Sequence, residues 1–194
     1  MIKLGIPPGS TLDLDDLAPD QFEEHVTRRL SEIVSHFRDQ EAADLVLKQE
    51  DPVLYDVYAS ERPALDGELL YGVTYLYPGK IGSEYFMTKG HFHAILETAE
   101  VYYCLQGEGF MVLDTPEGDS SVESFSRGKI LYVPPRWAHR AVNTSNDQTL
   151  VFFFVYPANA GHDYELIAAR GFRKLIVEED GHPAIIDNPH WSCE

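Results

Sequence analysis

Between residues 53 and 157 the chain consists of short runs rich in aromatic and β-branched side chains, separated by clusters of glycine, proline and charged residues. Runs of this kind predict β-strands joined by tight turns. The expected strands are 53–59, 69–78, 84–90, 101–107, 109–115, 121–126, 129–135 and 149–157. Many short strands with tight turns favour a closed or double-sheet barrel, so we predict an all-β fold.

Helical periodicity is strongest near the N-terminus. Apolar side chains recur at helical spacing from Phe22 to Phe37, and Asp20 is placed to cap a helix there. We therefore predict one amphipathic helix in this stretch. A second helix is expected at about 39–48, ending before Pro52 because the residue before a proline disfavours the α conformation.

The chain after residue 157 predicts a short helix followed by a hairpin. Residues 162–172 are typical of one or two helical turns ending at Gly171. The hairpin strands are expected at 174–179 and 181–187. A chain of 194 residues can bury one sizeable core, so we expect a single domain. In it, residues 1–50 form an N-terminal helical extension packed on the barrel, and residues 51–194 form the barrel with its C-terminal helix and hairpin.

The chain is strongly acidic, with 15 Lys and Arg against 32 Asp and Glu and a net charge of −17. Such a surface argues against nucleic acid or an anionic membrane as a partner, because both require a basic footprint. The chain has no apolar stretch long enough to span a membrane and no secretory leader pattern, so we expect a cytoplasmic protein. Cys104 and Cys193 are too few for a disulfide framework, and Cys104 is expected in the core.

Two histidines are spaced so that one ion can reach both. Side chains alternate along a strand, so His91 and His93 project to the same side. Glu100 and Tyr102 likewise share one face of the next strand, and if the two strands pair, a carboxylate meets both imidazoles. His139 arrives from a strand much later in the chain. The three histidines and Glu100 form a candidate metal site.

The segments around these residues resemble the two motifs of the cupin superfamily, whose fold is a double-stranded β-helix, or jelly-roll barrel. Gly128, Pro134, His139 and Asn143 match the second motif, and Arg136 replaces its middle glycine. The resemblance implies that the barrel holds a metal ion.

The first motif leaves a choice between two carboxylates. Tyr85 stands where the motif has a glycine, Glu97 lies at the usual distance from the histidine pair, and Glu100 lies at the usual distance from Gly107. Glu100 leads directly into a predicted strand, whereas Glu97 lies in a less regular connection. We therefore assign Glu100 as the ligand.

The sequence around the two motifs resembles a narrower group of proteins. The strings TKGHFH, PPRWAH and AGHDY, within a match from about 51 to 189, are similar to the cupin-type glucose-6-phosphate isomerases of archaea and some bacteria. This resemblance implies metal-dependent interconversion of glucose 6-phosphate and fructose 6-phosphate, with Glu100 as the candidate base. It also implies one divalent ion per subunit, on these ligands: His91, His93, Glu100 and His139. Three imidazoles and a carboxylate suit Fe²⁺, our first choice, or Mn²⁺, Ni²⁺, Co²⁺ or Zn²⁺.

The same resemblance assigns a substrate pocket. The residues at matching positions are Tyr55, Thr74, Thr88, Gly90, Tyr102, His162 and Tyr164. Thr74 also suits a strand simply as a β-former, and Gly90 also suits a turn. Lys89 and Arg136 are candidate cations for the phosphate, although Lys89 has the strand parity opposite to that of its neighbours.

Two other functions stay open at this stage, namely an iron-dependent cupin dioxygenase and a metal-free sugar-binding cupin. The route of isomerisation also stays open, because a carboxylate bound to a dication is a weak base and a hydride shift needs no base. We expect a homodimer, since the apolar run 149–157 carries more apolar surface than one barrel interior hides.

Overall fold

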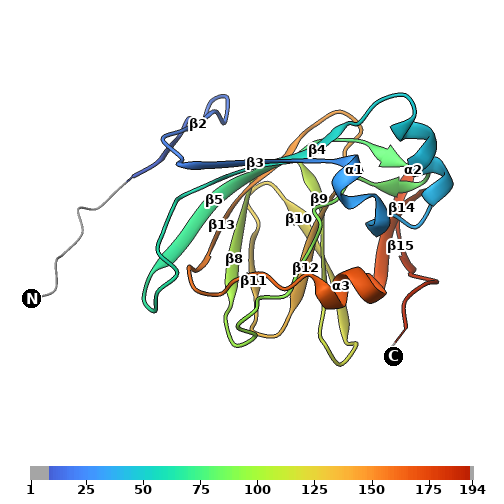
Figure 1. The fold of residues 1–194 in the computed structure, drawn as a ribbon. Helices are drawn as coiled ribbons and strands as arrows, with labels where there is room; N and C mark the ends of the chain where they lie inside the picture. The colour runs from blue at the N-terminus through green and yellow to red at the C-terminus, as the bar shows by residue number, and fades with distance from the viewer. Residues whose placement is uncertain (1–8, 193–194) are drawn as a thin grey trace, which may run out of the picture.

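The computed structural model describes residues 9–192, which form mainly β-structure around one barrel (Figure 1). A six-stranded sheet has the order β11-β8-β13-β5-β4-β3, and a three-stranded sheet has the order β10-β9-β12. The strands of these sheets are β3 (Glu24–Arg29), β4 (Val53–Ala59), β5 (Leu69–Leu76), β8 (Glu100–Gln106), β9 (Glu108–Asp114), β10 (Ser120–Ser126), β11 (Ile130–Val133), β12 (Ala138–Asn143) and β13 (Leu150–Pro157). The prediction of an all-β, double-sheet barrel is confirmed.

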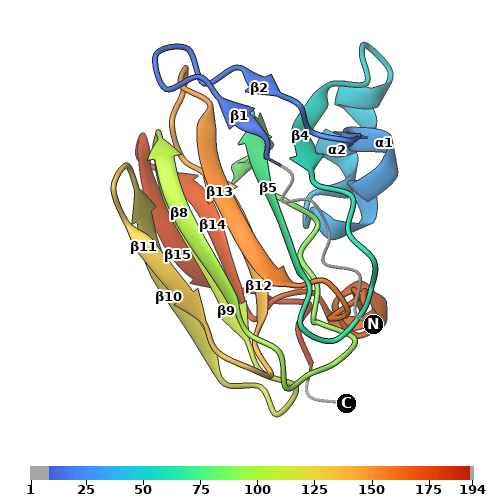
Figure 2. The same cartoon turned by 90° about the vertical axis from the view of Figure 1, so that its left-hand side faces the viewer.

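The two sheets face each other across the core (Figures 1 and 2). Phe125 of β10 and Phe152 of β13 lie with ring centroids 5.5 Å apart, and Tyr102 of β8 lies 6.3 Å from Phe125. All three are buried. Alternating apolar side chains on both inner faces therefore close the barrel, because each buried large side chain removes apolar surface from water.

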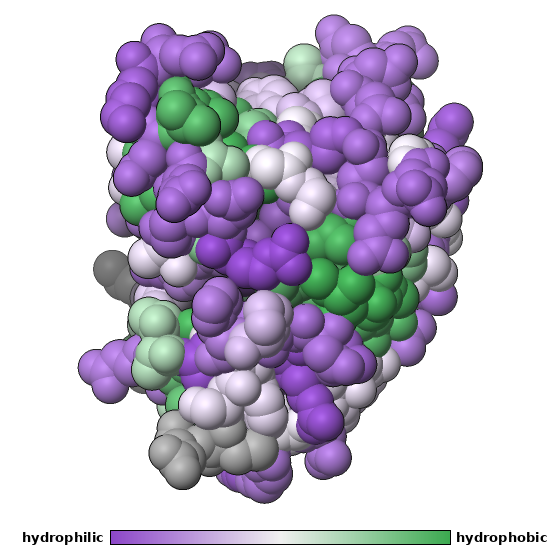
Figure 3. Space-filling model, turned by 90° about the vertical axis from the view of Figure 1, so that its right-hand side faces the viewer, coloured by the Kyte–Doolittle hydropathy of each residue, from purple (hydrophilic) through white to green (hydrophobic). Residues whose placement is uncertain are grey.

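Further elements cover the barrel at its edges. They are β1 (Thr11–Leu12), β2 (Pro19–Asp20), α1 (Leu30–Ile33), the 3₁₀ helix η1 (Val34–His36), α2 (Gln40–Leu47), β6 (Lys80–Ile81), β7 (Glu84–Tyr85), α3 (Glu165–Arg170), β14 (Lys174–Glu179) and β15 (His182–Asp187). A sheet of order β15-β14-β7-β6 lies against the three-stranded sheet through β14 and β9. The face that carries α2 and β15 is mainly hydrophilic (Figure 3). None of the helices among residues 9–192 is long and apolar enough to cross a membrane.

The N-terminal helix predicted from Phe22 to Phe37 is wrong over most of its length. Residues 24–29 form β3, which pairs antiparallel with β4, and Asp20 lies in β2 and caps no helix. The consecutive His25, Val26 and Thr27 all have modest helix propensity, and pairing with β4 stabilises an extended backbone over residues 24–29. Helical structure begins only at α1.

The other predicted helices and the hairpin are confirmed. In α2 the Asp39 Oδ1 atom accepts a hydrogen bond from the Ala42 backbone N–H at 2.9 Å, which caps the first turn. The helix α3 ends at Gly171, whose φ of 71° lies in the left-handed region. β14 and β15 form the expected hairpin.

The predicted strand 84–90 is regular only at Glu84–Tyr85. The chain then continues along β12 through isolated bridges, Met87 with Val142 and His91 with His139. The pairing considered between the histidine segment and the Glu100 strand does not form, because β8 pairs with β11 and β13. The metal-site histidines and Glu100 therefore meet across the barrel interior.

The apolar run at β13 is better covered than its sequence suggests. Leu17 packs on the outward-facing Val73 and Val151, and the Tyr75 hydroxyl donates a hydrogen bond to the Leu17 carbonyl. Val151 is consequently 2% exposed. The segment between β1 and β2 thus covers part of the apolar surface of β13, which we expected from the sequence to lie at a contact between two subunits.

Replacing Gly109 with Ala is expected to lower stability by about 2 kcal/mol or more, because overpacking a rigid site shifts the backbone. A Cβ atom at Gly109 would lie 1.9 Å from the Val142 carbonyl oxygen on the paired strand β12. Thermal unfolding measures the loss as a fall in Tm of roughly 4–8 °C. Gly9→Ala is the control, since nothing lies within 4 Å of its added Cβ; an equal Tm for both variants contradicts the prediction.

Candidate functional site

Four side chains from three parts of the chain meet inside the barrel. His91 and His93 come from the irregular segment after β7, Glu100 begins β8, and His139 lies on β12. Their ligand atoms, one from each residue, all lie within 4.8 Å of one another. His93, Glu100 and His139 are buried, at 5%, 2% and 3% exposure. The structure thus brings together the four expected ligands, which we call the His3Glu cluster.

Hydrogen bonds on the outer nitrogens fix how two of the imidazoles face the cluster. The Thr98 hydroxyl donates to the Ile95 carbonyl at 2.6 Å and therefore accepts from His93 Nδ1 at 2.8 Å. His139 Nδ1 lies 3.3 Å from the Trp137 carbonyl, which can only accept. In each neutral ring the proton is then on Nδ1, and the Nε2 lone pair points inward.

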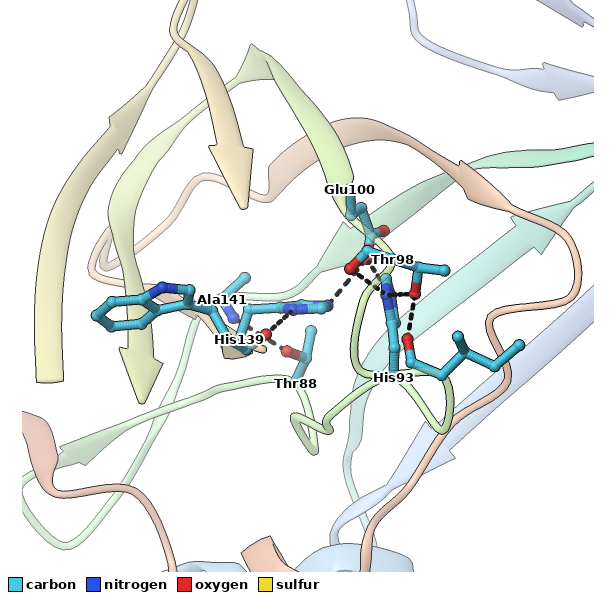
Figure 4. A network of polar contacts seen from close by, with 8 residues as sticks. Thr88, His93, Thr98, Glu100, His139 and Ala141 are labelled. Atoms are coloured by element: carbon cyan, nitrogen blue, oxygen red, sulfur yellow. Dashed lines mark hydrogen bonds and ion pairs between the residues drawn. The ribbon is translucent and has the colours of Figure 1, made fainter. Parts of the chain in front are cut away.

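The inward-facing atoms would repel one another without a cation. Glu100 Oε2 lies 3.2 Å from His93 Nε2 and 2.9 Å from His139 Nε2 (Figure 4). The buried Nε2 atom of His91 has no hydrogen-bond partner within the described part of the chain. Lone pairs and a carboxylate converging in a buried place fit a divalent metal ion, which accepts them all.

The ionisation of the cluster also suits a metal. Burial would raise the pKa of Glu100, but the adjacent His139 and then His93 outweigh this effect and hold the pKa at about 2. Burial, followed by the nearby His139, His162 and His93, keeps the pKa of His91 well below its usual range. At neutral pH the cluster therefore offers a carboxylate and a neutral His91, the forms that bind metal.

Thr98→Val is expected to weaken metal binding by roughly tenfold, because outer hydrogen bonds orient ligating imidazoles. Valine keeps the shape of threonine but cannot accept the proton of His93 Nδ1. Metal titration of the apoprotein measures the change. Thr11→Val, on the exposed strand β1, is the matched control; if both variants bind metal as the wild type does, the hydroxyl does not orient His93.

The cluster opens into a cavity of about 360 Å³ between the two sheets. Its walls include every residue expected to bind substrate: Tyr55, Thr74, Thr88, Gly90, Tyr102, His162 and Tyr164. His91, Glu100 and His139 also line it, so substrate atoms in the cavity can reach the metal site. The volume lies in the range of small-molecule sites.

The segment Thr88–Gly90 forms one wall with a fixed backbone. Thr88 exchanges hydrogen bonds with Ala141 of β12, through its N–H at 2.9 Å and through its Oγ1, which accepts from the Ala141 N–H at 3.0 Å. The Lys89 N–H lies 3.4 Å from the Tyr55 hydroxyl. Gly90 has φ +73°, and a Cβ there would lie 2.5 Å from the Phe172 ring, so both backbone conformation and packing require glycine.

Two residues considered from the sequence lie away from the cavity. Arg136 is 46% exposed at its side chain, pairs with Glu117 and Glu97, and does not line the cavity. Its φ of 74° explains why the motif has glycine there. Glu97 is 75% exposed at its side chain and lies outside the His3Glu cluster.

Sequence reasoning missed three polar side chains of the cavity wall. Glu24 and Arg28 lie on β3, the segment interpreted as a helix, and Tyr156 lies on β13. Alternation along β13 places Tyr156 on the same face as the inward-facing Phe152 and Phe154, a signal that the sequence contains. No comparable signal marks Arg28 once β3 is taken as helical.

The chain matches the family model described as glucose-6-phosphate isomerase over residues 27–191. It belongs to the glucose-6-phosphate isomerase family. The curated glucose-6-phosphate isomerase of Pyrococcus furiosus is 51% identical over 164 residues, covering 84% of this chain and 86% of that protein. That of Thermococcus litoralis is 46% identical over 190 residues, covering 98% and 99%.

A solved structure of a Bacillus subtilis oxalate decarboxylase mutant is also similar to this chain. Its TM-score is 0.44 at 22% identity, and the match covers 58% of this chain and 28% of that one. The family assignment rests on the sequence relatives. The matches cover 86% and 99% of the two relatives' own lengths. The resemblance seen in the motifs is therefore confirmed.

Proposed function

We propose that this chain interconverts D-glucose 6-phosphate and D-fructose 6-phosphate, using one divalent ion per subunit, Fe²⁺ as the first candidate. The ligands are the His3Glu cluster: His91, His93, Glu100 and His139. The observation that carries the proposal is that His91, Glu100 and His139 of this cluster line the cavity in a chain of the isomerase family. When bound, the ion supplies charge that polarises the oxygens on C1 and C2 of the open-chain sugar.

Glu100 is the proposed base. Its carboxylate is on the cavity wall, and it is the carboxylate of the His3Glu cluster. It would move a proton between C2 and C1 while the two oxygens exchange carbonyl and alcohol character. Burial and the nearby Glu100 carboxylate raise the pKa of Tyr102 well above its usual range, so its hydroxyl stays protonated and can donate to a sugar oxygen.

Arg28 and Lys89 are the proposed cations for the phosphate. They are the Lys and Arg side chains that line the cavity within residues 9–192. The Lys89 ammonium lies 4.1 Å from the centroid of the Tyr164 ring, which holds it at the wall. In a chain of net charge −17, such local positive charge is needed to bind an anion.

Arg28→Met is expected to raise KM for fructose 6-phosphate about tenfold with a smaller change in kcat, because a remote charge contact contributes to both ground state and transition state. Steady-state kinetics measure it. Arg29→Met is the matched control on the neighbouring position of β3, whose guanidinium donates to the Asp51 carbonyl and does not line the cavity. Equal KM values for both variants would remove Arg28 from the phosphate site.

A coupled assay of fructose 6-phosphate conversion tests the proposed function. Activity should disappear after chelation and return on adding a divalent ion, with Fe²⁺, Mn²⁺, Ni²⁺, Co²⁺ and Zn²⁺ compared in parallel. Each preparation is also monitored for oxygen uptake. Metal-loaded protein that consumes oxygen and leaves fructose 6-phosphate unchanged would contradict the isomerase and support a dioxygenase.

We also propose that the chain forms a homodimer through the outer face of β8 and β11. Tyr103, Ile130 and Tyr132 are 40%, 67% and 59% exposed there, and Ile130 lies opposite Tyr103 in the strand register. β11 is an edge strand of the six-stranded sheet, so its free backbone groups can pair with a second copy (Figure 2). Sedimentation at micromolar concentration tests this; a single species near 21.9 kDa contradicts it.

A further inference from the structure

A buried arginine lies directly behind the wall of the cavity. Arg140 follows His139 on β12 and projects to the opposite face of the strand, away from the His3Glu cluster. It is 2% exposed, and it does not line the cavity. The nearby Glu84 and Asp114 are also buried, yet no hydrogen bond or ion pair within residues 9–192 joins either carboxylate to Arg140. The hydrogen bonds of Arg140 are made to His36 and to the Lys89 carbonyl instead.

The Arg140 guanidinium group makes a hydrogen bond to the backbone of the segment Thr88–Gly90. An Arg140 terminal N–H donates to the Lys89 carbonyl at 2.7 Å, and the same nitrogen donates to His36 Nδ1 at 3.2 Å. His36 can accept because burial, then the charges of Arg140 and Lys89, lower its pKa to about 4 and keep the ring neutral. The Arg140 guanidinium therefore has two directed contacts, one of them on the backbone of a cavity residue.

Packing joins the same residues. The Arg140 guanidinium carbon lies 4.6 Å from the centroid of the Phe172 ring. That ring fills the space next to Gly90, where an added Cβ would meet Phe172 at 2.5 Å and the Arg140 Cβ at 3.1 Å. Arg140 and Phe172 together support the turn that carries the Lys89 side chain into the cavity.

We infer that Arg140 is a positioning residue for the anionic end of the substrate, fixing the Thr88–Gly90 backbone so that Lys89 and the adjoining wall face the phosphate. The inference rests on the proposed function and extends it to a residue outside the cavity. Burying a charge is costly, and stability alone is often served as well by an apolar side chain of similar volume. The contact with the Lys89 carbonyl gives Arg140 a specific task at this position.

The test compares Arg140→Lys with Arg170→Lys. Arg170 is also buried and donates to two backbone carbonyls, those of Thr115 at 2.8 Å and Pro116 at 3.0 Å, but it does not line the cavity or contact the Thr88–Gly90 turn. Lysine keeps the charge at both positions and loses the planar fork. Titration calorimetry should show the dissociation constant for fructose 6-phosphate rising at least tenfold in Arg140→Lys and staying within about threefold in Arg170→Lys, with metal content unchanged in both.

A double mutant identifies the route of the effect. If Arg140 acts through Lys89, the Lys89→Met and Arg140→Lys/Lys89→Met proteins bind the sugar phosphate equally weakly. His36→Leu, which leaves the guanidinium in place but frees one side of it, should weaken binding about threefold and serves if Arg140→Lys does not fold. Wild-type affinity in Arg140→Lys or His36→Leu, or additive losses in the double mutant, overturns the inference. A wild type that binds fructose 6-phosphate without converting it contradicts only the proposed function.

Discussion

Glu100→Gln is expected to lower kcat for fructose 6-phosphate by a hundredfold or more while the protein keeps part of its metal. Glutamine retains an oxygen that can face His93 and His139, but it cannot accept a proton at neutral pH. General base catalysis contributes roughly 10²–10⁴-fold in rate, so loss of the base has an effect of this size. Steady-state kinetics together with elemental analysis of the same preparation measure both quantities.

The matched control is Glu97→Gln. Its side chain is 75% exposed and pairs with Arg136 at 3.8 Å, so activity and metal content should stay close to those of the wild type. If Glu97→Gln loses metal while Glu100→Gln keeps both metal and activity, the assignment of the two carboxylates is reversed.

Solvent deuterium distinguishes the two routes of hydrogen transfer. A base that carries the hydrogen from C2 of glucose 6-phosphate can exchange it with water, so fructose 6-phosphate formed in D₂O should contain deuterium at C1. A direct hydride transfer from C2 to C1 leaves the product unlabelled. The low pKa of Glu100, about 2, makes it a weak base, so the label is a more direct test of its role than the rate alone.

The barrel could be predicted from local signals, and the ligand set from the resemblance of two short motifs. Glycine and proline mark the turns, and alternation along β8 places Glu100 with Tyr102. The distinction between Glu97 and Glu100 also followed from local structure, since only Glu100 begins a regular strand.

The errors arose where pairing between distant segments decides the structure. Val26 lies at helical spacing from Phe22 and Leu30, and only the partner strand β4 shows that residues 24–29 form β3. That error hid Arg28 from the list of cavity residues. The pairing of His91 with His139 on β12 likewise depends on topology, which no short motif specifies.

The supports of the site could not be predicted at all. Three such supports are the hydrogen bond of Thr98 with His93, the packing of Phe172 against Gly90 and the hydrogen bond of Arg140 with the Lys89 carbonyl. In each contact a side chain reaches an atom whose position the sequence pattern does not specify. These contacts are individually ordinary hydrogen bonds or packing contacts. They act on the site because they fix the orientation of groups that line the cavity.

His139→Ala is expected to reduce metal content and activity together, with metal affinity falling by at least tenfold and turnover falling in proportion. The change removes an inward-facing Nε2 lone pair and leaves three donors around the same space. It also removes the neighbour that contributes to the low pKa of Glu100, so that pKa should rise toward the value that burial alone favours. Metal per chain after dialysis, measured beside kcat, tests the prediction.

The control for His139→Ala is His25→Ala. His25 lies on β3, pairs with Asp56 at 2.9 Å and has a side chain that is 46% exposed, outside the His3Glu cluster. His25→Ala removes an exposed imidazole and leaves the His3Glu cluster intact, so it controls for metal bound at surface histidines. A difference in retained metal therefore reports the cluster itself. If His139→Ala retains as much metal as His25→Ala and loses activity alone, His139 acts on the substrate, and the remaining three ligands suffice to hold the ion.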